Sequence, residues 1–225
     1  MKRYILIAVA FLVLVAVTPG HAFGGNLLSN GSFQTGNLAG WTVFTTRNGN
    51  LGQGLPTVTL FNVTGTGLIE AAEFQVGEVN YLGAYFAGGG LDQDFSTTGG
   101  TLDLSYDFAA EGNPDAPGNA VGGFFSLLLD GSPLASDGVG VIHPGQIVRG
   151  SLSADITLSP GSYQFKILIT RPYANDGLTP FQYVTGASAS TAAMESDAAT
   201  PEPATLLLCA SGLLALVGFA KRRLA

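Results

Sequence analysis

Apolar and polar side chains alternate along the middle of the chain. Over residues 102–108, Leu102, Leu104, Tyr106 and Phe108 stand at every second position, with polar residues between them. Successive side chains of a β-strand point to opposite faces, so this pattern predicts a strand with one buried face. Further segments have the composition of short strands: 41–46, 57–61, 81–86, 91–95, 124–129, 148–156, 163–169 and 181–189. No segment shows a helical period, and we therefore expect an all-β fold.

Turn residues separate these segments. Asp130-Gly131 has the composition of a tight hairpin, and Pro160-Gly161 that of a turn leading into the next strand. Residues 111–120, rich in Gly, Pro and Asn, predict an exposed loop. Short strands with frequent Gly and Pro between them favour a β-sandwich over a barrel or a repeat array. We expect a single sandwich over residues 23–189, followed by a flexible linker over 190–200.

The N-terminal segment differs from this pattern. Lys2 and Arg3 precede an apolar stretch over residues 4–17, and small residues then lead to Ala22. A basic start, a short apolar run and small residues before a cut are typical of a secretory signal peptide, predicted here as residues 1–22. A retained membrane helix is the alternative, but the run is short and a helix breaker follows it.

A second apolar run stands near the other end of the sequence, over residues 204–220. As a helix it would span about 26 Å, close to the hydrocarbon thickness of a bilayer. It is preceded by Pro201-Glu202-Pro203 and followed by Lys221-Arg222-Arg223. In this order, residues 201–225 resemble the PEP-CTERM sorting tail of Gram-negative bacteria. The resemblance implies a transmembrane helix, processing by an exosortase-like protease and a link to exopolysaccharide; an ordinary anchor that is never cleaved is the alternative.

Charge narrows the range of partners. Residues 23–200 hold 15 acidic residues against Arg47, Arg149, Lys166 and Arg171, a net charge of −11. Four scattered cations make no patch for a phosphate backbone, so we expect no nucleic-acid partner. The chain's single cysteine, Cys209, lies in the second apolar run. The exported part must therefore be stable through its core, without disulfides.

The start of the mature chain carries a second resemblance. Residues 26–36 read Asn-Leu-Leu-Ser-Asn-Gly-Ser-Phe-Gln-Thr-Gly and are followed by Gly40-Trp41, and the segments 91–97 and 101–106 follow in order. Together they resemble jelly-roll modules of the galactose-binding-like class, which includes carbohydrate-binding modules. The resemblance implies a jelly-roll sandwich.

A structural calcium ion is common in that class, but its ligand positions are altered here. A carboxylate usual after the first Phe is replaced by Gln34, and paired aspartates of the last strand by Thr185-Gly186. These are weaker ligands for a hard cation. Asp92 and Asp94 would share one face of a strand and could chelate, although solvated carboxylates are the simpler interpretation. The sequence alone does not decide whether a calcium ion is bound, and it implies no other cofactor.

Few residues are available for catalysis. His143 is the only histidine after residue 22, so histidine triads and multi-histidine metal sites lack parts. Glu70, Glu73 and Glu78 are close in sequence, yet nothing fixes their separation. We therefore expect a protein that is not an enzyme.

Aromatic residues are the remaining binding chemistry, because their faces stack on sugar rings. We expect most of them, Trp41 included, to lie in the core. Tyr173 stands in a polar loop with Asn175 and Asp176, and these three side chains could contact a saccharide.

Taken together, the sequence predicts an exported surface or matrix protein of a Gram-negative bacterium. It would be anchored in the inner membrane before processing and would then be structural or adhesive within exopolysaccharide. The alternative is a lectin-like carbohydrate-binding module without catalysis. A glycan-processing enzyme is a third hypothesis.

Overall fold

The computed structural model describes residues 25–83, 85–173 and 178–191, and all of its regular structure is β-strand in these ranges. None of the residues described forms a helix that is long and apolar enough to cross a membrane. The predicted signal peptide and the predicted sorting tail lie outside the described ranges.

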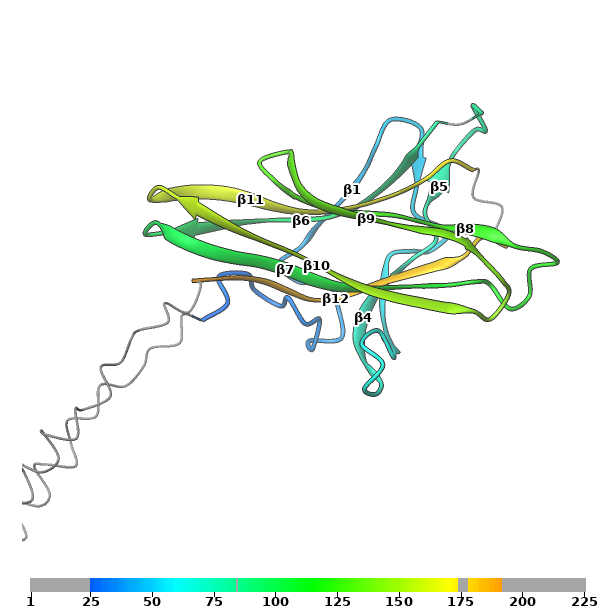
Figure 1. The fold of residues 1–225 in the computed structure, drawn as a ribbon, viewed down its shortest axis with the longest axis horizontal. Helices are drawn as coiled ribbons and strands as arrows, with labels where there is room; N and C mark the ends of the chain where they lie inside the picture. Colours follow the sequence, from blue (N-terminus) through cyan, green and yellow to red (C-terminus); the bar gives the residue numbers. More distant parts are fainter. Residues whose placement is uncertain (1–24, 84, 174–177, 192–225) are drawn as a thin grey trace, which may run out of the picture. The chain divides into compact units, whose positions relative to one another are not determined.

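Two five-stranded antiparallel sheets make up the fold (Figure 1). The first sheet has the order β1 (Thr42–Thr45), β6 (Ala87–Thr97), β11 (Gly161–Arg171), β8 (Ala120–Leu129), β9 (Ser132–Ile142). The second has the order β10 (Ile147–Leu158), β7 (Gly100–Glu111), β12 (Phe181–Thr191), β4 (Ile69–Phe74), β3 (Thr57–Phe61). A small pair, β2 (Gly49–Asn50) with β5 (Gly77–Glu78), forms a separate two-stranded sheet.

The long strands pass back and forth between the two sheets. From β6 onward the chain changes sheet at every connection except the β8–β9 hairpin. This alternation is the topology of a jelly-roll-type sandwich. The predictions of an all-β fold and of a β-sandwich are confirmed.

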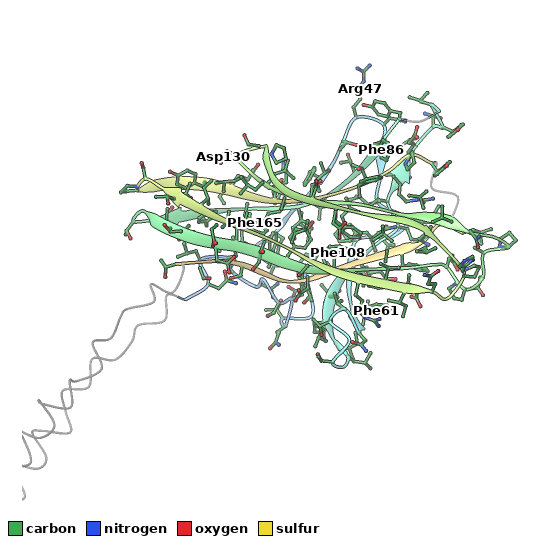
Figure 2. The ribbon with its side chains drawn as sticks, in the orientation of Figure 1. Arg47, Phe61, Phe86, Phe108, Asp130 and Phe165 are labelled. Carbon is green, nitrogen blue, oxygen red and sulfur yellow. The ribbon has the colours of Figure 1, made fainter. Side chains whose placement is uncertain are left out.

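The core lies between the sheets and is built from the predicted alternation. Leu102, Leu104, Tyr106 and Phe108 of β7 are all at most 1% exposed. Phe108 stacks on Phe125 of the opposite sheet with ring centroids 4.2 Å apart. Phe108 and Phe165 point into the space between the layers (Figure 2). Such close packing of large apolar side chains stabilises the sandwich without a disulfide.

The opening motif closes one side of the sandwich. Trp41 is buried in the core, as expected, and its Nε1 donates to the carbonyl of Asn30 at 3.1 Å. The buried amide of Gln93 ties this segment to β6: it accepts from the N–H of Ser29 at 2.6 Å and donates to the carbonyl of Gly40 at 2.8 Å. The motif residues and the β6 glutamine therefore form one structural unit.

The predicted turns are found. Asp130 and Gly131, with φ of 49° and 78°, join β8 to β9 in the left-handed conformation that a tight hairpin needs. Pro160 lies in the short connection from β10 to β11. The loop between β7 and β8 occupies residues 112–119, within the predicted range 111–120.

Three features differ from the expected strands. Residues 81–86 are not a strand: Tyr81 and Leu82 are 62% and 63% exposed, and no strand pairs with this segment among the described residues. β4 and β9 were not predicted. β12 continues to Thr191, past a bulge at Gly186, and therefore beyond the expected end of the sandwich at residue 189.

Candidate functional site

A pocket of about 410 Å³ opens at one end of the sandwich. Its walls come from the β7–β8 loop, the start of β8, the end of β9 and the connection from β11 to β12. The lining residues are Ala116, Pro117, Gly118, Asn119, Ala120, Val121, Val141, Arg171, Tyr173, Leu178 and Thr179. We call this cavity the rim pocket. It combines apolar walls with a few polar groups, the usual composition of a ligand site.

One exposed tyrosine lines the rim pocket, and a second exposed tyrosine lies against its ring. Tyr173 lines the pocket and is 45% exposed, and Tyr81 is 62% exposed. Their rings are parallel, with 1° between the planes and 6.3 Å between the centroids. Parallel exposed aromatic rings offer flat apolar surfaces with a polar hydroxyl at the edge. We call Tyr81 and Tyr173 the tyrosine pair.

The side chain and backbone of Glu78 hold both members of the tyrosine pair in place. Its N–H donates to the carbonyl of Tyr173 at 2.9 Å. Its Oε2 accepts from the N–H of Leu82, next to Tyr81, at 2.8 Å and from the amide of Asn48 at 3.3 Å. Glu78 is fully buried, so these bonds are shielded from water. Glu78 therefore links the two segments of the tyrosine pair, through its backbone N–H on one side and its carboxylate on the other.

Arg171 supports Tyr173 from inside the pocket wall. The guanidinium carbon lies 5.8 Å from the centroid of the Tyr173 ring, within the range of a cation–π contact. Its Nη1 donates to the carbonyl of Val76 at 3.3 Å, and the residue is 2% exposed. The arginine thus connects the Tyr173 ring to the backbone at Val76.

The loops around the rim pocket are bonded to one another. His143 Nδ1 and Asn119 Oδ1 are 2.6 Å apart, which connects the β9–β10 loop to the β7–β8 loop. Gly145 N–H donates to the carbonyl of Gly112 at 2.7 Å across the same two loops. His143 therefore has a structural contact between two loops.

The sequence-predicted binding residues divide into two groups. Tyr173 lies at the pocket, whereas Asn175 and Asp176 lie outside the described residues. The other large aromatic residues are mostly core, as expected: Trp41, Tyr106 and Tyr183 are each at most 8% exposed. Tyr81 was not singled out by the sequence, because the run in which it stands reads as a buried strand. The sorting residues Pro201, Glu202, Pro203, Lys221, Arg222 and Arg223 also fall outside the described ranges.

The three glutamates that are close in sequence do not come together. Glu70 and Glu73 are three residues apart on β4 and so point to opposite faces, and Glu78 is buried in β5. Glu73 instead lies near Glu111, which the sequence did not indicate. Burial and the charge of Glu111 raise the pKa of Glu73. The hydroxyl of Tyr183 donates to Glu111 Oε2 at 3.2 Å.

The positions considered for calcium have other contacts. Thr185 Oγ1 donates to the carbonyl of Glu70 at 2.8 Å, and Gly186 forms the β12 bulge. Asp92 lies 4.0 Å from the Lys166 ammonium; burial raises its pKa, Lys166 lowers it and Asp94 raises it. Gln34 is exposed. Among the residues that the structure describes, no group of three or more His, Cys, Asp or Glu side chains is arranged to hold a metal ion.

No protein-family model matches the chain, and no curated protein matches it. Solved structures that are similar include the module TmCBM61 in complex with β-1,4-galactotriose, with 13% identity, a TM-score of 0.41 and coverage of 73% of this chain and 97% of that one. The C-terminal family 22 carbohydrate-binding module of Clostridium thermocellum Xyn10B has 16% identity, a TM-score of 0.40 and coverage of 78% and 98%.

An arabinose-bound α-L-arabinofuranosidase, MgGH51, is also similar, with 16% identity and a TM-score of 0.43; the match covers 76% of this chain but 27% of that enzyme. The similar structures thus include carbohydrate-binding modules, the class that the sequence motifs resemble. At these identities, and with TM-scores below 0.5, the matches assign neither a ligand nor a site residue to this chain.

Proposed function

We propose that the sandwich binds a carbohydrate at the tyrosine pair and the rim pocket, without catalysis. The observation that carries the proposal is the pair of parallel, exposed tyrosine rings, Tyr81 and Tyr173, beside a pocket of about 410 Å³. Sugar rings have apolar faces that stack on such surfaces and hydroxyls that meet polar groups at the edges. Glu78 bonds to the backbone at Tyr173 and at Leu82, and Arg171 lies near the Tyr173 ring. Because the tyrosines are already positioned, binding costs little conformational entropy.

The experiment is a glycan array with the full chain, followed by titration of the selected glycan. Tyr81→Ala and Tyr173→Ala should each weaken binding about tenfold, a loss of about 1.4 kcal/mol. Tyr85→Ala is the matched control, because Tyr85 is also an exposed tyrosine, at 46%, but has no ring partner among the described residues. Equal losses in all three variants, or no saturable glycan binding, would overturn the proposal.

The absence of catalysis is part of the same proposal. Glu73 and Glu111 are close enough for the charge of Glu111 to raise the pKa of Glu73, and Glu111 accepts a hydrogen bond from Tyr183, which is not part of the tyrosine pair. We expect no new reducing ends when the selected glycan is incubated with the chain. Release of reducing ends that is abolished by Glu73→Gln would assign the chain to the glycan-processing enzymes instead.

Export and sorting are proposed from the sequence alone. In this proposal the chain is secreted through residues 1–22 and held in the inner membrane by residues 204–220. An exosortase-like protease then processes it at the Pro201–Pro203 region, and it acts as a structural or adhesive component of exopolysaccharide. Intact mass and location, measured in hosts with and without the sorting protease, test this: a tail-less protein outside the cell only when the protease is present supports it, and an intact tail in both hosts contradicts it.

A further inference from the structure

β10 is a long sheet edge without the proline, the short length or the bulge that commonly protect such edges. It has 12 residues, pairs with β7 alone among the described strands, and shows no register shift along that pairing. Its sequence contains no proline. Edge strands of this kind present a row of unpaired backbone N–H and C=O groups and readily accept another strand.

The other edges of the sandwich differ from β10. β1 and β3 are short, with four and five residues. β9 is long, but Pro133 stands on it and its pairing with β8 contains a register shift. Short strands, proline and bulges all disfavour pairing with a second chain. β10, which can be followed in Figure 1, is therefore the edge best suited to pairing.

The charges of β10 indicate what pairs with it. Arg149 and Asp155 are exposed, lie on the same face of the strand and stand at equal distances on either side of Leu152. Within the chain, Arg149 Nε donates to the carbonyl of Asn62 at 2.9 Å. If a second β10 pairs antiparallel with Leu152 opposite its own copy, each Arg149 comes opposite an Asp155 of the other chain. Opposite charges at directly paired positions stabilise a strand pair, whereas like charges destabilise it. Registers centred on residue 149 or 155 would instead oppose like charges.

A charge conflict within one chain also favours this register. Asp155 is directly opposite Asp103 of β7, and in the described part of the chain neither carboxylate forms an ion pair. Directly opposed like charges destabilise a sheet. An Arg149 from a second copy would arrive beside Asp155 on the same outer face and relieve this repulsion.

The side chains on the opposite face of β10 also fit the register centred on Leu152. Leu152 is buried, and Val148, Ala154 and Ile156 are half-buried against the main core. In the register centred on Leu152, Val148 lies opposite Ile156 of the other copy and Gly150 opposite Ala154. The apolar faces of the two sheets would then form one continuous surface, which adds burial on pairing.

We propose that two copies of this chain pair antiparallel through β10, with Leu152 at the two-fold axis and Arg149 of each copy opposite Asp155 of the other. The sheet that contains β10 in one copy and the same sheet in the other copy then form one continuous sheet. Pairing also gives one particle two rim pockets, so that a polymer with repeated units is bound at two points and with higher avidity.

Sedimentation velocity over a range of concentrations tests the proposal on the full chain. Wild type should form a dimer. Arg149→Asp and Asp155→Arg should each raise the dissociation constant about tenfold or more, because each opposes like charges at both symmetry-related positions. The double variant, with both changes, should restore the dimer because the opposite charges are again paired.

Matched controls separate this effect from net charge. Arg47→Asp and Asp94→Arg change the net charge by the same amounts at exposed positions outside β10, and should leave the dissociation constant unchanged. A monomer at all concentrations overturns the proposal. So does a dimer that both single variants leave unchanged, or one that the double variant fails to restore, since association would then use another surface or another register.

Discussion

A buried hydroxyl in the core shows how one residue changes the free energy of unfolding. Tyr106 is 1% exposed, and its hydroxyl has no hydrogen-bond partner among the described residues. An unsatisfied buried polar group costs about 1–3 kcal/mol. Tyr106→Phe should therefore raise the free energy of unfolding by about 1 kcal/mol, as measured by urea denaturation. Tyr183→Phe is the control: it removes a bond to Glu111 and should lower that free energy, and a destabilised Tyr106→Phe would contradict the account.

Glu73 makes stability depend on pH. Its folded-state pKa is raised above the ordinary value of 4.5, first by burial and then by the charge of Glu111. The folded state therefore binds the proton more tightly than the unfolded state. The stabilisation is fully present below pH 4.5 and is lost as pH rises through the raised pKa. In Glu73→Gln, the fall in the free energy of unfolding over this window should be smaller than in wild type; an identical fall in both would contradict the assignment.

At the scale of elements, close strand packing depends on glycines in β6. A Cβ added at Gly90 would overlap the carbonyl oxygen of Ile167 on β11. Backbone cannot move aside as a flexible side chain can, so Gly90→Ala should lower the free energy of unfolding by roughly 1–3 kcal/mol. Gly140→Ala on β9 is the matched control, since nothing lies within 4 Å of its added Cβ. Equal thermal stability of the two variants would show that β6 and β11 can separate.

The strands that the sequence predicted are those with a clear alternation or an apolar run between turn residues. β7 is the best example, because its alternating leucines and aromatics face the opposite sheet. β9 was missed because Pro133, Gly138 and Gly140 interrupt any pattern. The run 81–86 was wrongly assigned to a strand, because hydropathy does not distinguish a buried aromatic from an exposed one.

The site was predictable only in part for a related reason. Tyr173 stood out because it lies in a polar loop. Tyr81 becomes its neighbour only through β5, where buried Glu78 bonds to Tyr173 and to Leu82. That contact depends on the tertiary structure, and no local pattern indicates it.

At the scale of the whole molecule, rigid sheets carry a site that is built from loops. The rim pocket draws residues from strands of the first sheet and from connections to the second. None of its lining residues belongs to β10, the edge that we propose pairs with a second copy. Binding and pairing are therefore expected to vary independently: Tyr173→Ala should not change the mass of the particle, and Arg149→Asp should not change the intrinsic affinity of one pocket for a short glycan. Titration with a short glycan and sedimentation of both variants check this, and a loss of both properties in either variant would contradict it.

The central claim is that the tyrosine pair contacts carbohydrate, and NMR of the tyrosine rings tests it most directly. In the full chain with ¹³C-labelled tyrosine rings, we would titrate the glycan selected by the array. The account predicts that the ring signals of Tyr81 and Tyr173 shift in a saturable manner while those of buried Tyr106 and Tyr183 do not. Saturable binding that leaves the signals of Tyr81 and Tyr173 unchanged would contradict it.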